Sequence, residues 1–468
     1  MIISQPFSNT KPRPFPRFFS HNIFRAQEWL LRRPTFPYFS ELEQTQYLPR
    51  ETLEALQLEK LGRLLQTALA HCPWHAGRIR EAGIEPQDMS WEDFRRLPFM
   101  DKEDARKHGA EMVWKSVPGG AHPYSTGGSS GKPLTFHFSR WRQASDAAGR
   151  MRARRWWGVE PGDPEVYLWG APVELKKTDR IKTLRDRSMN HLVLNAFAMS
   201  PQAMADYVTA IVNFTPKCIY GYSSSVALLA GFILENGGPL HLPSLKVVCT
   251  TGEPLYPHQR NLISEAFGVP VANEFGSRDI GFTAHEAPSG QMLLMSESII
   301  LEVVDGEGQP VPPGETGEAV MTGLHSEAQP FIRYRTGDMV RLSETTDPDG
   351  RGLHVVESVA GRITDFLIHQ DGSIVHALAA IYILREIPGI DQFKIVQETL
   401  DRFEIQLVTN HQWHPEKDSN AIVTGFKKRF GENIKIQLVQ AHSIPPEASG
   451  KFRQVISNVP NPWGRVSH

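Results

Sequence analysis

The feature that most constrains the fold of this chain is a regular alternation of helical and strand-like segments between about residues 140 and 267. Amphipathic stretches with helical spacing alternate with short apolar runs rich in β-branched and aromatic residues. The pattern predicts helices near 140–157, 201–213, 223–236 and 257–267, and strands near 165–169, 217–220 and 246–250. Such alternation is typical of a mostly parallel α/β sheet, in which the crossovers between strands carry helices.

The pattern changes twice after this region. The chain has 468 residues, which is more than one hydrophobic core usually serves. Between residues 293 and 341 the segments become short and β-like, with Gly and Pro turns. After Gly361 an α+β pattern follows, with strands near 364–368, 392–397, 402–408 and 434–438 and helices near 377–386 and 416–430. We therefore expect a large domain over residues 1–361 and a small C-terminal domain over residues 362–468.

The first 50 residues are rich in Pro, Phe and Arg and show little periodicity. We expect them to form an arm wrapped on the surface of the large domain. From Thr52 the leucines fall near helical spacing, which predicts a long amphipathic helix directly after the arm.

Composition and charge argue against several classes of protein. Charged residues make up 22% of the chain and the formal net charge is -2, which does not favour a nucleic-acid binder. No run of 18 uncharged apolar residues occurs, and the first residues carry prolines and charges where a signal peptide has an apolar region. We expect a cytoplasmic protein, monomeric or homodimeric, with its three widely spaced cysteines reduced.

A turn-rich loop gives the first chemical signal. It consists of Ser125, Thr126, Gly127, Gly128, Ser129, Ser130, Gly131, Lys132 and Pro133. Its glycines allow close approach of the backbone to a ligand, and its hydroxyls are suited to phosphate oxygens. It is not a Walker A loop, because Thr126 stands where the first Gly belongs and Pro133 replaces the Mg²⁺-binding hydroxyl. A solvated Gly/Ser linker is the alternative interpretation.

The loop resembles the phosphate-binding signature of adenylate-forming enzymes, and later segments are similar to further motifs of the phenylacetate-CoA ligase branch of that superfamily. Residues 250–254 resemble a segment whose backbone lines the adenine and acyl pockets, which implies nucleotide contacts for Gly252, Glu253 and Pro254. Residues 273–279 resemble a segment in which an aromatic residue flanks adenine and a carboxylate helps to hold Mg²⁺. The resemblance implies these two roles for Phe275 and Asp279.

The intervening residues of that segment, Gly276, Ser277 and Arg278, are placed at the nucleotide by the same resemblance. This chain departs from the family pattern here, because relatives usually have Thr or Ser followed by Glu where this chain has Arg278 and the shorter Asp279. Mg²⁺ needs only one or two carboxylates beside substrate phosphates, so the role of Asp279 is retained. A surface ion pair between Arg278 and Asp279 is the alternative.

Three segments nearer the C-terminus complete the resemblance. Residues 334–338 are similar to the segment whose carboxylate binds the ribose hydroxyls of ATP, which implies this role for Asp338. Residues 361–365 resemble the hinge between the two domains, with Arg362 contacting the nucleotide and Thr364 and Asp365 at the hinge. Residues 444–451 resemble the terminal Gly-Lys loop, whose lysine bridges the substrate carboxylate and the α-phosphate. Lys451 takes that role, with a solvated surface lysine as the alternative.

The acyl pocket is expected near Tyr222 and Thr251, where an open α/β sheet places its ligands, with His137 as a further candidate. Ordinary packing is the alternative for Tyr222 and His137. His285 is interpreted as a core or surface histidine rather than a zinc ligand, since no cysteine lies nearby in the sequence.

Together these resemblances imply an ATP- and Mg²⁺-dependent ligase that converts a carboxylic acid into an acyl-AMP, with Lys451, Lys132 and Asp279 as catalytic residues. CoA is the first acceptor to consider. Residues 370–376 lack the Asn and Pro that many relatives have near the CoA channel, so two alternatives stay open. One is a synthetase that passes the acyl group to an amine, a sugar or a carrier-protein thiol, and the other is a degenerate nucleotide-binding protein without turnover.

Overall fold

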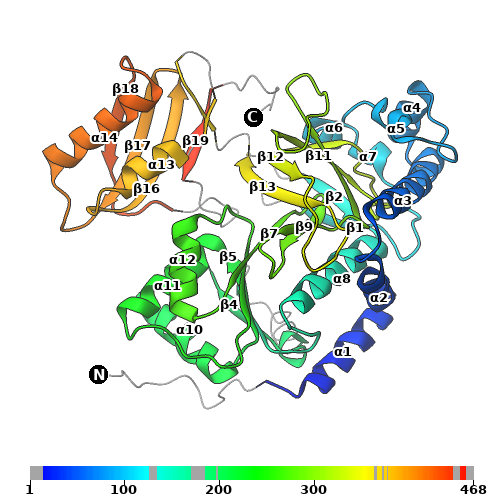
Figure 1. Ribbon diagram of the computed structural model, residues 1–468, viewed down its shortest axis with the longest axis horizontal. Helices are drawn as coiled ribbons and strands as arrows, with labels where there is room; N and C mark the ends of the chain where they lie inside the picture. Colours follow the sequence, from blue (N-terminus) through cyan, green and yellow to red (C-terminus); the bar gives the residue numbers. More distant parts are fainter. Residues whose placement is uncertain are drawn as a thin grey trace.

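The computed structural model describes residues 14–125, 134–169, 185–196, 199–362, 366–370, 374–376, 378–445 and 454–459. Two sheets dominate this part of the chain, an 11-stranded sheet and a four-stranded sheet that lies apart from it (Figure 1).

The helices are α1 (Arg17–Leu30), α2 (Thr35–Thr45), α3 (Arg50–His71), α4 (Pro73–Glu81), α5 (Trp91–Arg95), α6 (Lys102–Lys107), α7 (Gly109–Met112), α8 (Arg140–Trp156), α10 (Pro201–Phe214), α11 (Ser223–Glu235), α12 (Pro257–Phe267), α13 (Leu378–Arg385) and α14 (Pro415–Phe430). The strands are β1 (His122–Ser125), β2 (Thr135–Phe138), β3 (Glu165–Trp169), β4 (His191–Asn195), β5 (Cys218–Tyr222), β6 (Val247–Thr251), β7 (Val271–Ser277), β8 (Gly281–Glu286), β9 (Met292–Leu294), β10 (Ile299–Val304), β11 (Thr316–Gly323), β12 (Tyr334–Ser343), β13 (Val355–Arg362), β14 (Phe366–Ile368), β15 (Ile374–His376), β16 (Ile390–Thr399), β17 (Arg402–Thr409), β18 (Lys435–Gln440) and β19 (Val455–Ser457).

The large sheet has the strand order β10-β11-β12-β13-β9-β8-β7-β6-β5-β3-β4. Strands β4, β3, β5, β6 and β7 pair in parallel, and the pairing becomes antiparallel from β7 to β8 onward. The predicted parallel α/β region and the β-like region after residue 293 therefore join edge to edge in one sheet.

Local sequence explains the central elements of the parallel half. Every residue of β5 and of β6 is buried, as expected of parallel strands covered on both faces. Helix α12 begins with Pro257 at its first position, where the missing N–H costs nothing, and it is followed by Gly268 in the left-handed conformation (φ 66°). Helices α10, α11 and α12 cover one face of these strands through an apolar cluster that includes Ile211, Leu229 and Ile263 (Figure 1).

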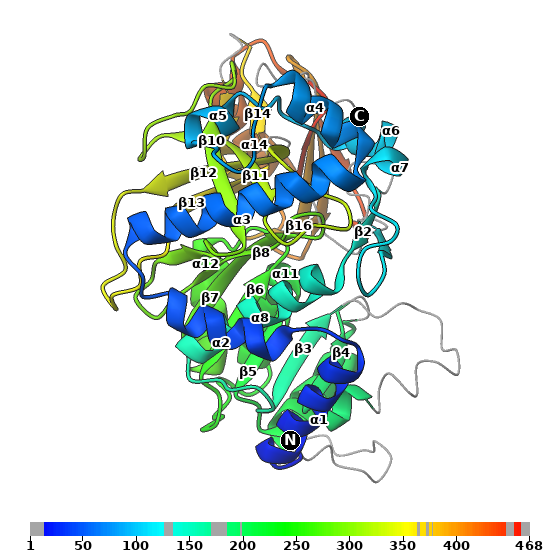
Figure 2. The ribbon, with the colours of Figure 1, turned by 90° about the vertical axis from the view of Figure 1, so that its right-hand side faces the viewer.

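The N-terminal segment contains helices that the sequence pattern did not predict. The described part contains two helices, and α2 buries Tyr38, Phe39 and Leu42 against Ala148 and Met151 of α8. Figure 2 shows α1, α2 and α3 following one another along the same side of the molecule. The sequence pattern missed α2 because its burial depends on a helix about 110 residues later in the chain.

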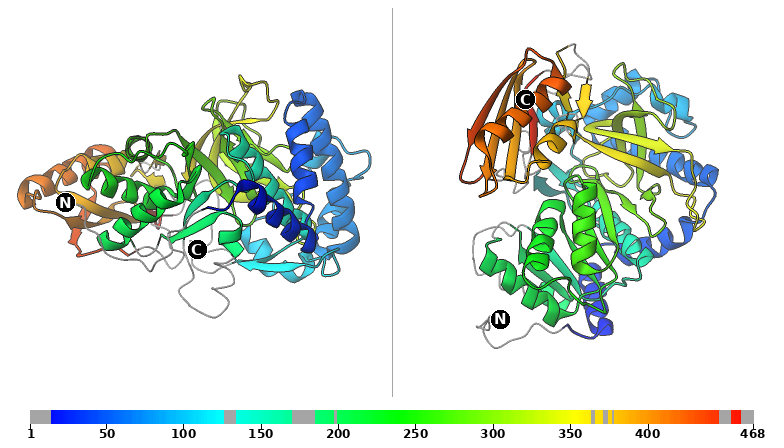
Figure 3. Two further views of the ribbon diagram at one scale, coloured as in Figure 1. Left: turned by 90° about the horizontal axis from the view of Figure 1, so that it is seen from below. Right: turned by 60° about the vertical axis from the view of Figure 1, so that its left-hand side comes forward.

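The C-terminal elements have a core of their own. Strands in the order β18-β17-β16-β19 pack against α13 and α14 around Phe403, Phe426 and Phe430. This part lies at one end of the molecule and α3 lies at the other (Figure 3). Tyr256, which immediately precedes α12, packs against the C-terminal core and links it to the large sheet.

None of the helices in the described ranges is both long and apolar enough to cross a membrane.

Candidate functional site

Three residues form one cross-strand row at the carboxyl edge of the parallel strands. Tyr222 of β5 is in register with Thr251 of β6, and Thr251 is in register with Glu274 of β7. We call these three residues the edge row. The segments assigned to the nucleotide by sequence, 252–254 and 275–279, follow directly after the edge row. Ligands of open α/β sheets bind at this edge, so the fold places the predicted acyl and nucleotide residues side by side.

Glu253 uses its carboxylate locally. Oε2 accepts the backbone N–H of Ser224 at 2.9 Å, in the first turn of α11, and the backbone carbonyl of Glu253 accepts the Ser223 hydroxyl at 3.3 Å. A carboxylate is stabilised at a helix N-terminus by the unpaired N–H groups and the helix dipole. Gly252 precedes it in the left-handed conformation (φ 76°), which a side chain rarely adopts. The chain therefore turns sharply at Gly252, and the hydrogen bonds of Glu253 hold the turn against the start of α11.

Tyr222 lies close to two charged groups of the predicted site. Burial raises the pKa of the Tyr222 phenol, the nearby positive charge of Arg278 opposes that rise, and the negative charge of Glu253 adds to it. The ring of Tyr222 stacks on Trp169 of β3, with ring centres 4.4 Å apart and planes 16° from parallel. The structure thus brings Tyr222, Glu253 and the exposed Arg278 together at the strand edge.

The end of β7 is tightly packed. Phe275 is 9% exposed and belongs to the same apolar cluster as Phe136 and Tyr334. A Cβ atom on Gly276 would lie 2.6 Å from the backbone oxygen of Gly281, so only glycine fits at this point of the bulged β7–β8 pair. The Ser277 hydroxyl accepts the backbone N–H of Ile280 at 3.2 Å and stabilises the turn that carries Arg278 and Asp279.

Asp279 is held by a distant residue. Its Oδ2 accepts a hydrogen bond of 2.8 Å from the hydroxyl of Tyr334, whose side chain is 2% exposed. Asp279 itself is partly exposed. A half-buried carboxylate with one oxygen fixed by a neutral donor is a fitting ligand for a hard cation such as Mg²⁺. The bond also joins the end of β7 to the start of β12.

Asp338 lies on β12 directly opposite Arg362 on β13, as the antiparallel register pairs them. Its side chain is 7% exposed, and its backbone N–H donates to the Thr336 hydroxyl at 3.1 Å. That hydroxyl donates in turn to the carbonyl of Ala319 at 3.0 Å. The sheet register therefore places the predicted ribose ligand and the predicted nucleotide arginine opposite each other on neighbouring strands.

His137 belongs to a different environment. It lies on β2, and both its backbone N–H and its ring Nδ1 are within hydrogen-bonding distance of Gln329 Oε1, at 3.0 and 3.3 Å. The geometry thus accounts for His137 by its contact with Gln329 and gives it no contact with the edge row among the described residues.

Several predicted residues lie outside the described residues. These are Thr126, Gly127, Gly128, Ser129, Ser130, Gly131 and Lys132 of the phosphate loop, the hinge residues Thr364 and Asp365, and Lys451. Of Ser125, only the backbone, at the end of β1, is described. Their roles stay predictions from the resemblance.

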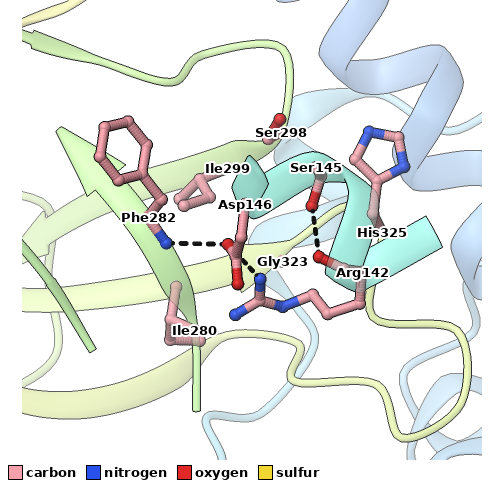
Figure 4. Close-up of a pocket in the computed structure, with 9 residues that line it drawn as sticks. All are labelled: Arg142, Ser145, Asp146, Ile280, Phe282, Ser298, Ile299, Gly323 and His325. Atoms are coloured by element: carbon pink, nitrogen blue, oxygen red, sulfur yellow. Dashed lines mark hydrogen bonds and ion pairs between the residues drawn. The ribbon is translucent and has the colours of Figure 1, made fainter. Parts of the chain in front are cut away.

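A row of charged residues lies on α8 and was not among the residues predicted from the sequence. Arg142, Asp146, Arg150 and Arg154 follow one another every four residues and so share one face of the helix. Arg142 pairs with Asp146, which also accepts the backbone N–H of Phe282 at 2.9 Å beside a cavity of about 10 Å³ (Figure 4). The four-residue spacing was the signal that could have revealed the row.

His285 lies deeper in the same region and is fully buried. Its Nε2 faces Arg154 Nη1 at 3.1 Å and its Nδ1 faces the carbonyl of Glu286 at 2.8 Å. Cys249, distant in sequence, lies against it. Both ring nitrogens are thus engaged by the protein, and the described residues contain no group of three or more His, Cys, Asp or Glu suited to a metal ion.

Comparisons with known proteins find relatives over most of the chain. A family model described as the CapK C-terminal domain matches residues 367–458. Protein CapK of Staphylococcus aureus is 22% identical, with 93% of this chain and 95% of the relative covered. A phenylacetate-coenzyme A ligase of Thermus thermophilus is 26% identical, with 90% of this chain and 99% of the relative covered.

The same fold occurs in a solved structure of 2-hydroxyisobutyryl-CoA ligase in the postadenylation state with 2-HIB-AMP. The TM-score is 0.69 at 24% identity, and 89% of this chain and 92% of that chain are covered. The predicted fold class, a large α/β part with a β-rich region and a small α+β C-terminal domain, is confirmed. The resemblance to the phenylacetate-CoA ligase branch is confirmed as well.

Proposed function

We propose that this adenylate-forming, phenylacetate-CoA ligase-like protein uses ATP to activate a carboxylic acid as an acyl-AMP and then transfers the acyl group to CoA. Named CoA ligases that align with this chain over nearly their whole length support the proposal. The observation that carries it is the meeting of separate chain segments at one edge of the sheet. The ends of β6 and β7 lie together there, and the Tyr334–Asp279 bond brings the start of β12 to them.

In the first step, a carboxylate oxygen of the acid forms a bond to the α-phosphorus of ATP while the bond from that phosphorus to the β-phosphate oxygen breaks and pyrophosphate leaves. Catalysis of such transfers depends mainly on positioning and on charge neutralisation. Asp338 accepts hydrogen bonds from the ribose hydroxyls, and Arg362 on the neighbouring strand contacts the nucleotide. Lys451 and Lys132 neutralise the charge that develops between carboxylate and phosphate.

Asp279 is the residue that would hold Mg²⁺, with Tyr334 fixing its orientation. A bound Mg²⁺ supplies positive charge to the phosphate oxygens. In the second step, the CoA thiol gives up its proton to solvent and its sulfur bonds to the acyl carbon. The bond from that carbon to the phosphate oxygen breaks, and AMP leaves.

The test is acid-dependent pyrophosphate release with ATP and Mg²⁺ over a panel of aryl and aliphatic acids, with and without CoA. Loss of the Lys451 charge in Lys451→Ala should abolish release but spare transfer to CoA from a supplied acyl-AMP, because that lysine acts in adenylation. Lys428→Ala, which removes an exposed lysine on α14 of the small domain, is the matched control.

Equal loss of activity in both half reactions would contradict the assignment of Lys451 to the adenylation step. Pyrophosphate release that CoA does not stimulate would point to an amine, sugar or carrier-protein acceptor. Nucleotide binding without release for every acid would contradict the proposed function.

A further inference from the structure

Glu274 is a buried carboxylate with one oxygen in use and one free. Its side chain is 6% exposed. Oε1 accepts the Tyr220 hydroxyl at 2.7 Å and the Thr251 hydroxyl at 3.1 Å. Oε2 is buried and has no hydrogen-bond partner among the described residues. A buried acceptor left in this state costs free energy, so the free oxygen is a candidate for contact with a bound molecule.

Arg150 of α8 faces Glu274 across the sheet surface. Its Nη2 is 3.9 Å from Glu274 Oε1, and its guanidinium lies over the rings of Tyr220 and Phe282 at 5.8 and 5.3 Å from their centres. Its Nε is also buried without a partner among the described residues. The positive charge of Arg150 thus lies near the Glu274 carboxylate, and the described residues leave part of the hydrogen-bonding capacity of Arg150 unused.

Exposure along α8 shows where a small molecule can approach. Arg142 and Arg154 have side chains that are 3% exposed, whereas the residues between them on the same face, Asp146 and Arg150, are 26% and 35% exposed. This face of α8 is therefore most exposed at the level of Asp146 and Arg150, and Arg150 is the residue that faces Glu274.

The position of Glu274 in the sheet connects it to the reaction. It is a member of the edge row with Tyr222 and Thr251, and the predicted nucleotide segments begin immediately after it. An acid whose carboxylate lies at the α-phosphate would extend its acyl part along this row. The stacked rings of Trp169 and Tyr222 offer an apolar wall at one end, and Glu274 offers a charged acceptor at the other.

Resting on the proposed function, we propose that Glu274 binds a hydrogen-bond donor, a hydroxyl or amino group, on the acyl part of the substrate, and that Arg150 holds the Glu274 carboxylate in position. The substrate is then a hydroxy or amino carboxylic acid rather than a plain aryl or alkyl acid. A plain acid would cover Oε2 with apolar atoms and leave this buried acceptor without a hydrogen bond. The binding site would therefore discriminate strongly against acids that lack a donor group.

The experiment measures ATP–pyrophosphate exchange with matched acids that differ only by a hydroxyl or amino group in place of hydrogen. Suitable sets are phenylacetate with its 4-hydroxy and 4-amino derivatives, and butanoate with 4-hydroxybutanoate and 4-aminobutanoate. The wild-type protein should show a kcat/KM about 10- to 100-fold higher for a donor-bearing acid than for its plain counterpart. Glu274→Met, which keeps the side-chain length but removes the acceptor, should abolish or reverse that preference.

Glu165→Gln is the matched control. Glu165 is also a buried carboxylate that meets an α8 arginine, Arg154, but it lies at the amino end of β3, away from the edge row. This variant should keep the wild-type preference. A purely structural role for Glu274 would lower exchange with all acids alike and leave the ratio between matched acids unchanged.

Wild-type exchange that is equal for matched acids, or faster with the plain ones, would overturn the role of Glu274 and leave the proposed function intact. This comparison needs no variant, so it stands even if Glu274→Met fails to fold. Absence of exchange with every acid would instead contradict the proposed function, and the inference would fall with it.

Discussion

Asp279 is positioned by a residue 55 places later in the chain. The Tyr334 hydroxyl that donates to it is almost fully buried, in the apolar cluster that also contains Phe275. A hydroxyl in this setting has little freedom to turn away, so it fixes both the carboxylate orientation and the side from which a cation can approach. Relatives usually have Thr or Ser followed by Glu where this chain has Arg278 and Asp279. The hydrogen bond from Tyr334 thus stabilises the shorter Asp279 carboxylate in one orientation.

Replacing Tyr334 with Phe tests this support. The variant keeps the ring packing and removes only the donor, so the fold should persist while Asp279 loses its orientation. We expect the Mg²⁺ concentration for half-maximal pyrophosphate exchange to rise about 10-fold, as for other residues that orient a metal ligand. Tyr207→Phe removes a hydroxyl that donates to the Asn195 carbonyl at 3.0 Å and serves as the control. An unchanged Mg²⁺ requirement in Tyr334→Phe would mean that Asp279 is positioned without this bond.

At the scale of elements, α2, α3 and α8 all contact one buried residue, Glu297. Glu297 is completely buried and pairs with Arg152 of α8. Its Oε1 accepts the Thr45 hydroxyl at 2.9 Å, and its backbone carbonyl accepts Lys60 Nζ of α3 at 3.1 Å. Removal of one partner from such a pair leaves a buried charge without compensation, at a cost of about 3–5 kcal/mol. The N-terminal segment therefore stabilises the position of α8, and with it the placement of Arg150.

Leu42→Ala measures how much α2 contributes. Leu42 is fully buried against α8, so its truncation should lower the free energy of unfolding by about 2–5 kcal/mol. Leu30→Ala on α1 removes an equal volume from a side chain that is 74% exposed and should change it by no more than about 0.5 kcal/mol. Urea unfolding of both variants beside the wild type gives the comparison. Similar small effects in both would indicate that α2 lies loosely on the surface.

At the scale of the whole molecule, several histidines of the large α/β part are buried. Burial lowers the pKa of His75 to about 3, with the charge of Arg78 adding to the effect. Burial likewise lowers the pKa of His325 to about 3, helped by Lys60 and Arg142. His325 faces the Tyr38 hydroxyl at 2.9 Å and stacks on Trp141, so it too joins the N-terminal segment to α8.

These histidines predict loss of stability in acid. Each is neutral in the folded protein but takes up a proton in the unfolded chain below its ordinary pKa of 6.5, so the unfolded state binds more protons between pH 6.5 and about 3. Stability is unaffected by them above pH 6.5 and falls below it, by about 1.4 kcal/mol per pH unit for each histidine.

His325→Gln provides the measurement. The variant loses the contacts of the His325 ring with Tyr38 and Trp141, so it should be less stable than the wild type at pH 7.5. Because glutamine stays neutral in acid, the difference in urea midpoint between the two proteins should narrow steadily between pH 6.5 and 5. A gap that is constant over this range would show that His325 does not contribute to the acid sensitivity.

The sequence by itself determined many of the elements and the order of the motifs. Strand 165–169 and helix 257–267 were predicted with the bounds that the structure has, and the other predicted α/β and C-terminal elements agree to within a few residues, whereas α2 and β4 were not predicted. Helices and strands can both be predicted from the local sequence, because their periodicity and their Pro or Gly boundaries depend only on neighbouring residues. Short motifs such as 334–338 are likewise local.

The tertiary structure alone decided which of these segments meet. The burial of α2 against α8, the bond from Tyr334 to Asp279 and the pairing of Arg150 with Glu274 each join residues that are far apart in sequence. The local periodicity of the sequence does not predict such contacts, since they arise from strand order and from the packing of helices on the sheet. Glu274 was unremarkable in the sequence for this reason, and it became a candidate specificity residue only when the sheet register placed it beside Thr251 and Tyr222.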